Sequence, residues 1–289
     1  DLITDLSKIP NLFVAARNSS FSFKGQRPDI REVSEKLGVS LVLEGSVRKM
    51  GDRLRINAQL IKGSDGGHLW AERYDGLVSE IFEFQDRITS EIIGALELKL
   101  TAKGIPERNW TTDINAYDLF LKGRDRYYRL SNEDVLAAKG YFEQAIEIDP
   151  SFSEAYSFLS WCYFQSWTHS WQGWSNSLEK AHENASKAVE LDGLSATALA
   201  RLAWAQIYIG DHQTALDNIE KASKIDSNSG EVLFLYGAIL NYIGEPKKAG
   251  SILQQALKVD SFVSPSWDVH VGLSNILLDD YENAIKFYS

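Results

Sequence analysis

The sequence predicts a small α+β domain followed by an all-α superhelix of repeated helix pairs. Strand-like alternation of apolar and polar residues occurs only before residue 104, and apolar residues at helical spacing continue from residue 116 to the end. A pattern of three small residues is also written twice with a spacing of 34 residues: Gly210, Ala215 and Ala222 recur as Gly244, Ala249 and Ala256. A fixed period of this kind is typical of helical repeats, which bury their apolar faces by stacking.

The net charge is carried by the second part of the chain. Residues 1–104 have 15 Lys+Arg and 15 Asp+Glu, whereas residues 105–289 have 15 and 25. Because phosphate binding needs a basic surface, this excess argues against nucleic acid as a partner of the repeats. The single cysteine, Cys162, lies between Trp161 and Tyr163 and is predicted to be a buried thiol rather than a reactive one.

The chain begins with segments that alternate between helix and extended structure. Apolar residues at helical spacing predict a helix over residues 1–9. The apolar run 12–16 predicts a short buried strand, and the polar stretch 18–27 predicts a loop. A second helix is expected to begin after the capping residue Asp29 and to end at Gly38.

Three strands and a long helix follow. Residues 41–47 and 54–60 alternate between apolar and polar side chains, and Gly51 between them suits a tight hairpin turn. Residues 68–74 predict a third antiparallel strand. Residues 78–100 form an amphipathic pattern, so we expect a helix that packs on one face of the sheet.

The expected division of the chain is an α+β domain at 1–104, a linker at 105–115 and helical repeats at 116–289. The linker is predicted because the stretch 101–115 lacks periodicity and contains Gly104 and Pro106.

The small residues divide the helical part into four repeats and a shortened fifth. One alanine of each second helix falls at a repeated position: Ala145, Ala188, Ala222 and Ala256. The spacings are 43, 34 and 34 residues, so repeat two contains nine extra residues. Both ends of the sequence look cut, and we expect a larger parent protein.

Two family resemblances follow from these residues. The 34-residue period, together with Pro150 after Asp149, resembles the tetratricopeptide repeat. Residues 1 to about 100 resemble a TolB-like α/β domain in the phrases LGVSLVLEGSVRK, RLRINAQLI and GGHLWAERYD. The combined arrangement is similar to the region that follows the catalytic domain in bacterial class III adenylate/guanylate cyclases. Related arrangements accompany winged-helix transcription regulators.

The resemblance implies a regulatory or scaffolding region of a signalling protein, tethered near a membrane helix upstream. The resemblance does not decide whether this region lies on the cytoplasmic or the extracytoplasmic side of the membrane. It also leaves open whether the protein forms a homodimer. The usual first strand of the TolB-like domain is missing. The cyclase catalytic domain is not in the sequence, so the resemblance carries over no catalytic aspartates.

The residue patterns predict no enzyme site, no metal site and no cofactor. The five histidines lack metal-ligand spacing: His68, His169, His182, His212 and His270. His68 and Glu72 fall on one face of a strand, where a solvated or hydrogen-bonded pair is favoured over an acid/base couple.

The strongest functional signal is an aromatic surface for a protein or peptide partner. In tetratricopeptide repeats the first helix of each unit lines a concave groove, and the corresponding positions are rich in aromatic residues. They are Tyr117, Phe120, Arg124, Tyr127, Tyr128, Glu154, Ser157, Trp161, Phe164, Ala200, Trp204, Tyr208, Phe234, Asn241 and Tyr242. Aromatic anchors favour protein binding, whereas the Lys/Asn/Arg set that grips a peptide carboxylate is absent from these positions. Two alternatives stay open: the rings form core, or the chain senses a small molecule between its two parts.

The extra residues of repeat two hold a separate aromatic group. Trp167, Trp171 and Trp174 occur within residues 166–174. These rings either pack over the end of their own repeat or form an exposed flap.

Overall fold

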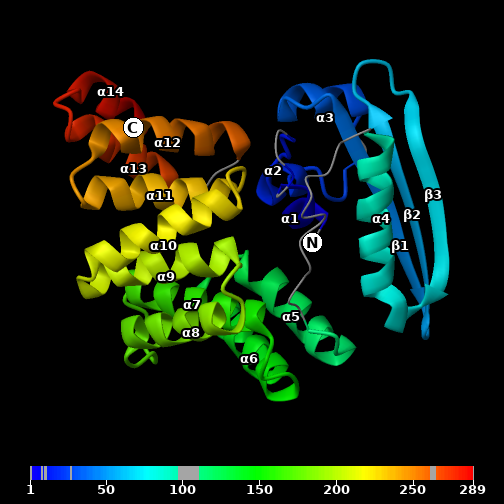
Figure 1. Cartoon of the computed structure of the whole chain (residues 1–289), viewed down its shortest axis with the longest axis horizontal. Coiled ribbons are helices and arrows are strands. Elements are labelled where there is room, and N and C mark those ends of the chain that lie inside the picture. The colour runs from blue at the N-terminus through cyan, green and yellow to red at the C-terminus, as the bar shows by residue number, and fades with distance from the viewer. Residues whose placement is uncertain are drawn as a thin grey trace. The chain divides into compact units, whose positions relative to one another are not determined.

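The computed structural model describes residues 2–7, 9, 12–26, 28–96, 111–260 and 265–288 (Figure 1). The chain divides into two compact units, one made of Asp1–Pro106 and Leu257–Ser264, the other of Glu107–Ala256 and Pro265–Ser289. Most of the predicted linker at 105–115 lies outside the described residues, and the helix α5 begins at Ile114 within it.

The first unit contains a three-stranded antiparallel sheet in the order β1-β2-β3. The strands are β1 (Leu41–Met50), β2 (Arg53–Lys62) and β3 (His68–Leu77). Gly51 has a φ of 61° in the hairpin turn, a conformation that a residue without a side chain adopts readily. The predicted three strands in sequence order are therefore confirmed.

A helix covers one face of the sheet. Figure 1 shows α4 (Ile81–Ala95) running along the strands, preceded by the short 3-10 helix η1 (Val78–Glu80). The core between helix and sheet includes Leu54, Ile56, Tyr74, Phe84, Ile88, Ile92 and Ile93. Residues 97–100 of the predicted helix lie outside the described residues.

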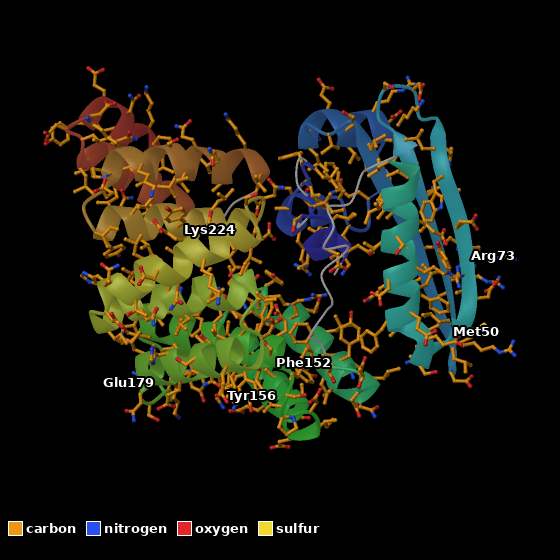
Figure 2. All side chains as sticks on the ribbon, viewed as in Figure 1. Met50, Arg73, Phe152, Tyr156, Glu179 and Lys224 are labelled. Carbon is orange, nitrogen blue, oxygen red and sulfur yellow. The ribbon has the colours of Figure 1, made fainter. Side chains whose placement is uncertain are left out.

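Polar contacts tie the same helix to β3. Trp70 Nε1 and Tyr74 Oη both donate to Glu91 Oε2, at 3.2 and 2.8 Å. The opposite face of the sheet is polar, with Arg55 paired to Asp75 and Arg73 pointing away from α4 in Figure 2. The sheet thus has one buried and one solvated face, as the alternation predicted.

In the described residues before the sheet, all regular secondary structure is helical. It contains α1 (Leu2–Ser7), α2 (Arg17–Phe21) and α3 (Ile30–Leu37). Asp29 caps α3 by accepting from Arg31 N–H at 2.8 Å, and Gly38 ends it with a φ of 63°, as predicted.

Two predictions for this segment are wrong. Residues 12–16 form no strand, because they pair with none of the three strands of the sheet. Their apolar side chains are used another way, since Leu12 and Val14 pack against the sheet core. The stretch predicted as a loop at 18–27 instead includes most of α2.

The second unit consists of consecutive helix pairs, although residues 257–259 at the end of α12 (Pro246–Val259) are grouped with the first unit. The pairs are α5 (Ile114–Tyr127) with α6 (Asn132–Ile148), α7 (Ser153–Thr168) with α8 (Ser177–Leu191), α9 (Ala196–Ile209) with α10 (His212–Ile225), α11 (Gly230–Tyr242) with α12, and α13 (Pro265–Ile276) with α14 (Tyr281–Tyr288). This is the predicted all-α repeat architecture.

The small residues lie where the helices approach one another. Ala145, Ala188, Ala222 and Ala256 are all 0% exposed. Gly210, which ends α9, has a φ of 89°, so the turn between α9 and α10 requires a left-handed residue there.

One close contact allows a test of this packing. A Cβ on Gly123 of α5 would lie 2.7 Å from Cε1 of the fully buried Phe142 ring, whereas a Cβ on Gly140 of α6 would meet nothing within 4 Å. We expect Gly123→Ala to lower the free energy of unfolding by about 1–3 kcal/mol through overpacking. Gly140→Ala is the matched control and is expected to gain up to about 1 kcal/mol, because alanine favours helix. Urea unfolding of both variants measures the difference, and equal shifts would contradict the assigned contact.

Candidate functional site

A continuous row of rings runs along the first helices of repeats two to five. We call it the aromatic row, and its members are Trp161, Phe164, Trp167, Trp204, Tyr208, Phe234, Tyr242 and His270. Ring centroids of Phe164 and Tyr208 are 5.4 Å apart, and those of Trp204 and Tyr242 are 5.8 Å apart. These separations are typical of aromatic pairs that attract one another.

Helical spacing and the repeat period together bring these rings into line. Trp204 and Tyr208 are four residues apart on α9 and therefore share one face. Tyr208 and Tyr242 are one period of 34 residues apart, and their hydroxyl oxygens are 2.9 Å apart. Burial, and then the hydrogen bond with Tyr242, raises the pKa of Tyr208 well above its ordinary value.

The aromatic row has a buried layer and an exposed layer. Trp204, Phe164 and Phe234 are 5%, 6% and 8% exposed. Trp167 and Tyr242 are 37% and 43% exposed, and Trp161 and Tyr208 are half-buried. The buried rings serve the packing between helices, so only the exposed layer offers contact area to a partner.

The prediction that Phe120 lines a groove is wrong. Its ring is 0% exposed and packs against Phe142, Phe152 and Phe158 at centroid distances of 5.8, 5.0 and 5.4 Å. These three rings come from α6 and α7, together with the turn between them, and they enclose Phe120 in the core.

The other predicted residues of repeat one are placed unevenly. Tyr117 and Tyr127 are buried, at 5% and 4% exposed. Arg124 is half-buried, with its guanidinium 5.4 Å from the Phe120 ring centroid, and Tyr128 is 36% exposed. Tyr128 is thus the surface aromatic of this repeat.

A buried ion pair lies beside the aromatic row. Arg201 is 2% exposed and binds Glu231 through two nitrogens, Nε at 2.7 Å and Nη2 at 3.2 Å. Its Nη1 donates to Ser157 Oγ at 3.1 Å, so one guanidinium connects α7, α9 and α11. Burial alone would lower the pKa of Arg201, but the charge of Glu231 outweighs burial and the pKa is raised.

The sequence analysis did not identify Arg201 as a residue that links several helices. The signal was available, since Arg201 is the only charged residue of α9. A lone charge within an apolar helix predicts a buried partner.

His270 of α13 also belongs to the aromatic row, although sequence reasoning assigned it no role. Its ring lies 5.4 Å from Phe234 and 5.6 Å from Trp204. Asn241 Nδ2 donates to the His270 carbonyl at 3.0 Å, and Ser274 Oγ donates to Asn241 Oδ1 at 2.9 Å. Burial lowers the pKa of His270 to about 4, so the ring is neutral at physiological pH.

The three tryptophans of the repeat-two insert pack against different residues. Trp167 lies in the last turn of α7, and its ring centroid is 4.8 Å from that of Tyr208. Trp174 packs edge-on against Tyr163 of its own repeat at 5.4 Å, and Trp171 stacks on His169 at 5.2 Å. Of the three, Trp167 joins the aromatic row, and Trp174 packs on its own repeat.

The rest of the described structure offers no competing site of the common kinds. Within the described ranges, no group of three or more His, Cys, Asp or Glu side chains could hold a metal ion. His68 and Glu72 are both exposed, and Cys162 is fully buried. None of the helices that the structure describes is long and apolar enough to cross a bilayer.

The period, the helix pairs and the small residues at their contacts define an all-α helical-repeat fold of the tetratricopeptide type, preceded in the sequence by a small α+β unit. No family model matches the chain. A relative named “Putative adenylate cyclase 3” from Rhizobium meliloti (strain 1021) is 45% identical over 197 residues, which are 67% of this chain and 33% of the relative. The chain thus spans about a third of the length of that relative.

Helical-repeat proteins of known structure match the chain at low sequence identity. The thermophilic TPR protein TTC0263 of Thermus thermophilus is 18% identical with a TM-score of 0.49, covering 60% of this chain and 88% of that one. The Pseudomonas aeruginosa protein pilF is 19% identical with a TM-score of 0.45, covering 60% and 73%.

The buried layer of the aromatic row predicts a loss of stability on truncation. Because Trp204 is 5% exposed and contacts Phe164, Tyr208, Tyr242 and His270, we expect Trp204→Ala to cost about 3–5 kcal/mol of unfolding free energy. Chemical unfolding measures this loss. A melting temperature close to that of the wild type would show that Trp204 is not a packing residue.

His270 predicts a pH dependence of stability. The unfolded chain binds a proton at this residue below pH about 6.5, whereas the folded chain does so only below about 4. Stability is therefore expected to fall as the pH drops through this window, by up to about 1.4 kcal/mol per pH unit. His270→Gln should reduce that slope, measured by urea unfolding near pH 7 and near pH 5. The exposed His212→Gln is the control, and an equal change in both variants would contradict the prediction.

Proposed function

We propose that this chain is a non-catalytic regulatory and protein-interaction region of a bacterial signalling protein of the class III adenylate cyclase type. Its partner is a peptide or helix bound on the aromatic row. The observation that carries the proposal is the exposed layer of that row, in which Trp167, Tyr208 and Tyr242 continue from one repeat to the next.

Rigid aromatic side chains suit this role. Trp and Tyr bury much area on binding and lose little conformational entropy, which is why they dominate binding energies at interfaces. In this chain the exposed rings rest on a buried layer, since Tyr242 and Tyr208 both contact Trp204, at 5.8 and 5.2 Å. The exposed rings are therefore held in place before a partner arrives.

The proposed parent protein has two supports. The sequence resembles the region that follows the catalytic domain of class III cyclases, and the 45% identical relative carries a cyclase name. We infer that catalysis takes place elsewhere in the parent and that the repeats connect it to another protein.

A truncation of the exposed layer tests the binding role. Peptides selected from a displayed random library on the wild-type chain are expected to bind Tyr242→Ala at least about tenfold more weakly, because loss of an aromatic anchor costs more than about 1 kcal/mol. Stability should change little, since Tyr242 is 43% exposed.

The control for this experiment is Leu136→Ala on α6, a residue that is 54% exposed and lies outside the aromatic row. It should leave peptide affinity unchanged. Selected peptides that bind Tyr242→Ala as tightly as the wild type would refute the aromatic row as the binding site. A small molecule that co-purifies in native mass spectrometry would favour the sensing alternative.

A further inference from the structure

The helices that carry the aromatic row are poor in positive charge. Together, α7, α9, α11 and α13 contain one Lys or Arg, which is Arg201, against Glu154, Glu231 and Asp268. Arg201 is 2% exposed and binds Glu231 through two nitrogens. Its charge is thus neutralised within the fold, and it does not act as a cation toward a partner.

An acidic residue follows a tyrosine of the exposed layer at two successive repeat ends. Asp211 follows Tyr208 by three residues, and Glu245 follows Tyr242 by the same interval. Both carboxylates are exposed and lie just after the C-terminal ends of α9 and α11.

The two repeat ends are adjacent but not equivalent. The 2.9 Å contact between the Tyr208 and Tyr242 hydroxyls fixes their proximity. Lys247 and Lys248 follow Glu245 at the start of α12, and Lys248 lies 3.7 Å from Glu220. Asp211, by contrast, is followed by no Lys or Arg before Lys221, so the sequence around it is the more acidic of the two.

The rings of Trp167 and Tyr208 form a corner, and Phe164 packs against both of them. The Trp167 and Tyr208 centroids are 4.8 Å apart, and their planes meet at 63°. The faces of aromatic rings are negative and attract a guanidinium or ammonium group. A corner of two rings with a carboxylate three residues along the chain has the chemistry of a site for a cationic side chain.

We propose that the partner segment bound by the aromatic row is basic, and that one of its Arg or Lys side chains stacks in the Trp167–Tyr208 corner with Asp211 as counter-charge. This inference rests on the proposed function, because it takes the aromatic row as the binding surface. It adds the charge of the partner, which charge complementarity with an acidic and aromatic surface determines.

Three matched peptides test the charge of the partner. They are amphipathic helices with the same apolar face and with Arg, Gln or Glu at every polar position, titrated by calorimetry against the whole chain. The Arg peptide is expected to bind about tenfold tighter than the Gln peptide, and this advantage should shrink at high salt. The Glu peptide should bind weakest.

Two substitutions test the assigned corner. Asp211 caps α10 by accepting from Thr214 N–H at 3.4 Å, and asparagine caps equally well, so Asp211→Asn removes the charge without removing the cap. It should reduce the preference for Arg over Gln by several-fold, as should Trp167→Ala. The control is Asp217→Asn, an exposed carboxylate on the same helix, which should leave the preference intact.

The outcomes separate this inference from the function on which it rests. Equal or tighter binding of the Gln or Glu peptide, weakened by Tyr242→Ala, overturns the basic partner and leaves the binding surface in place. An Arg preference that Asp211→Asn and Asp217→Asn reduce equally overturns the assigned corner, since the attraction is then only the net charge of the repeats. Failure of all three peptides to bind overturns both.

Discussion

The close approach of paired helices at small residues is the constraint from which the rest of the repeat unit follows. Ala145, Ala188, Ala222 and Ala256 have no exposed surface, so each second helix meets its neighbours where no larger side chain fits. This contact recurs after 43, 34 and 34 residues, once in each of four helix pairs, and it therefore sets the position of the first helices. The aromatic row is a consequence, because residues one period apart, such as Tyr208 and Tyr242, are brought to 2.9 Å between hydroxyls.

A polar interaction adds specificity to this apolar stacking. Arg201 contacts Ser157 of the preceding repeat and Glu231 of the following one, so a single guanidinium spans three repeats. Hydrophobic stacking is tolerant of small shifts, whereas a bidentate pair with bonds of 2.7 and 3.2 Å is not. A shift of α9 against α11 would leave a buried charge without its partner, which costs far more than an imperfect apolar contact.

The sequence predicted the repeat architecture well because its evidence is periodic. An alanine that recurs after 34 residues predicts the same local contact each time, and the sheet follows from alternation over β1, β2 and β3. The wrong predictions concern single features whose outcome depends on distant residues. Residues 12–16 are apolar enough for a strand but do not pair with the sheet, and Phe120 has the spacing of a groove residue but is enclosed by rings of α6 and α7.

The candidate site was predicted only in part for a related reason. Helical spacing shows which residues share a face, but it does not show how deep each ring lies, and depth separates the 5% exposed Trp204 from the 43% exposed Tyr242. Arg201 and His270 were missed because their roles arise from partners 30 or more residues away, namely Glu231 for the first and Trp204 for the second.

The layered construction of the aromatic row separates stability from recognition. Trp204 and Phe234 hold the first helices together, and neutral His270 fills the same layer without adding a positive charge. The rings above them, Trp167 and Tyr242, contribute less to the fold because much of their surface remains in water. A partner can therefore be recognised by the exposed layer without strain in the stack, and substitutions there can change what is bound while the repeats stay folded.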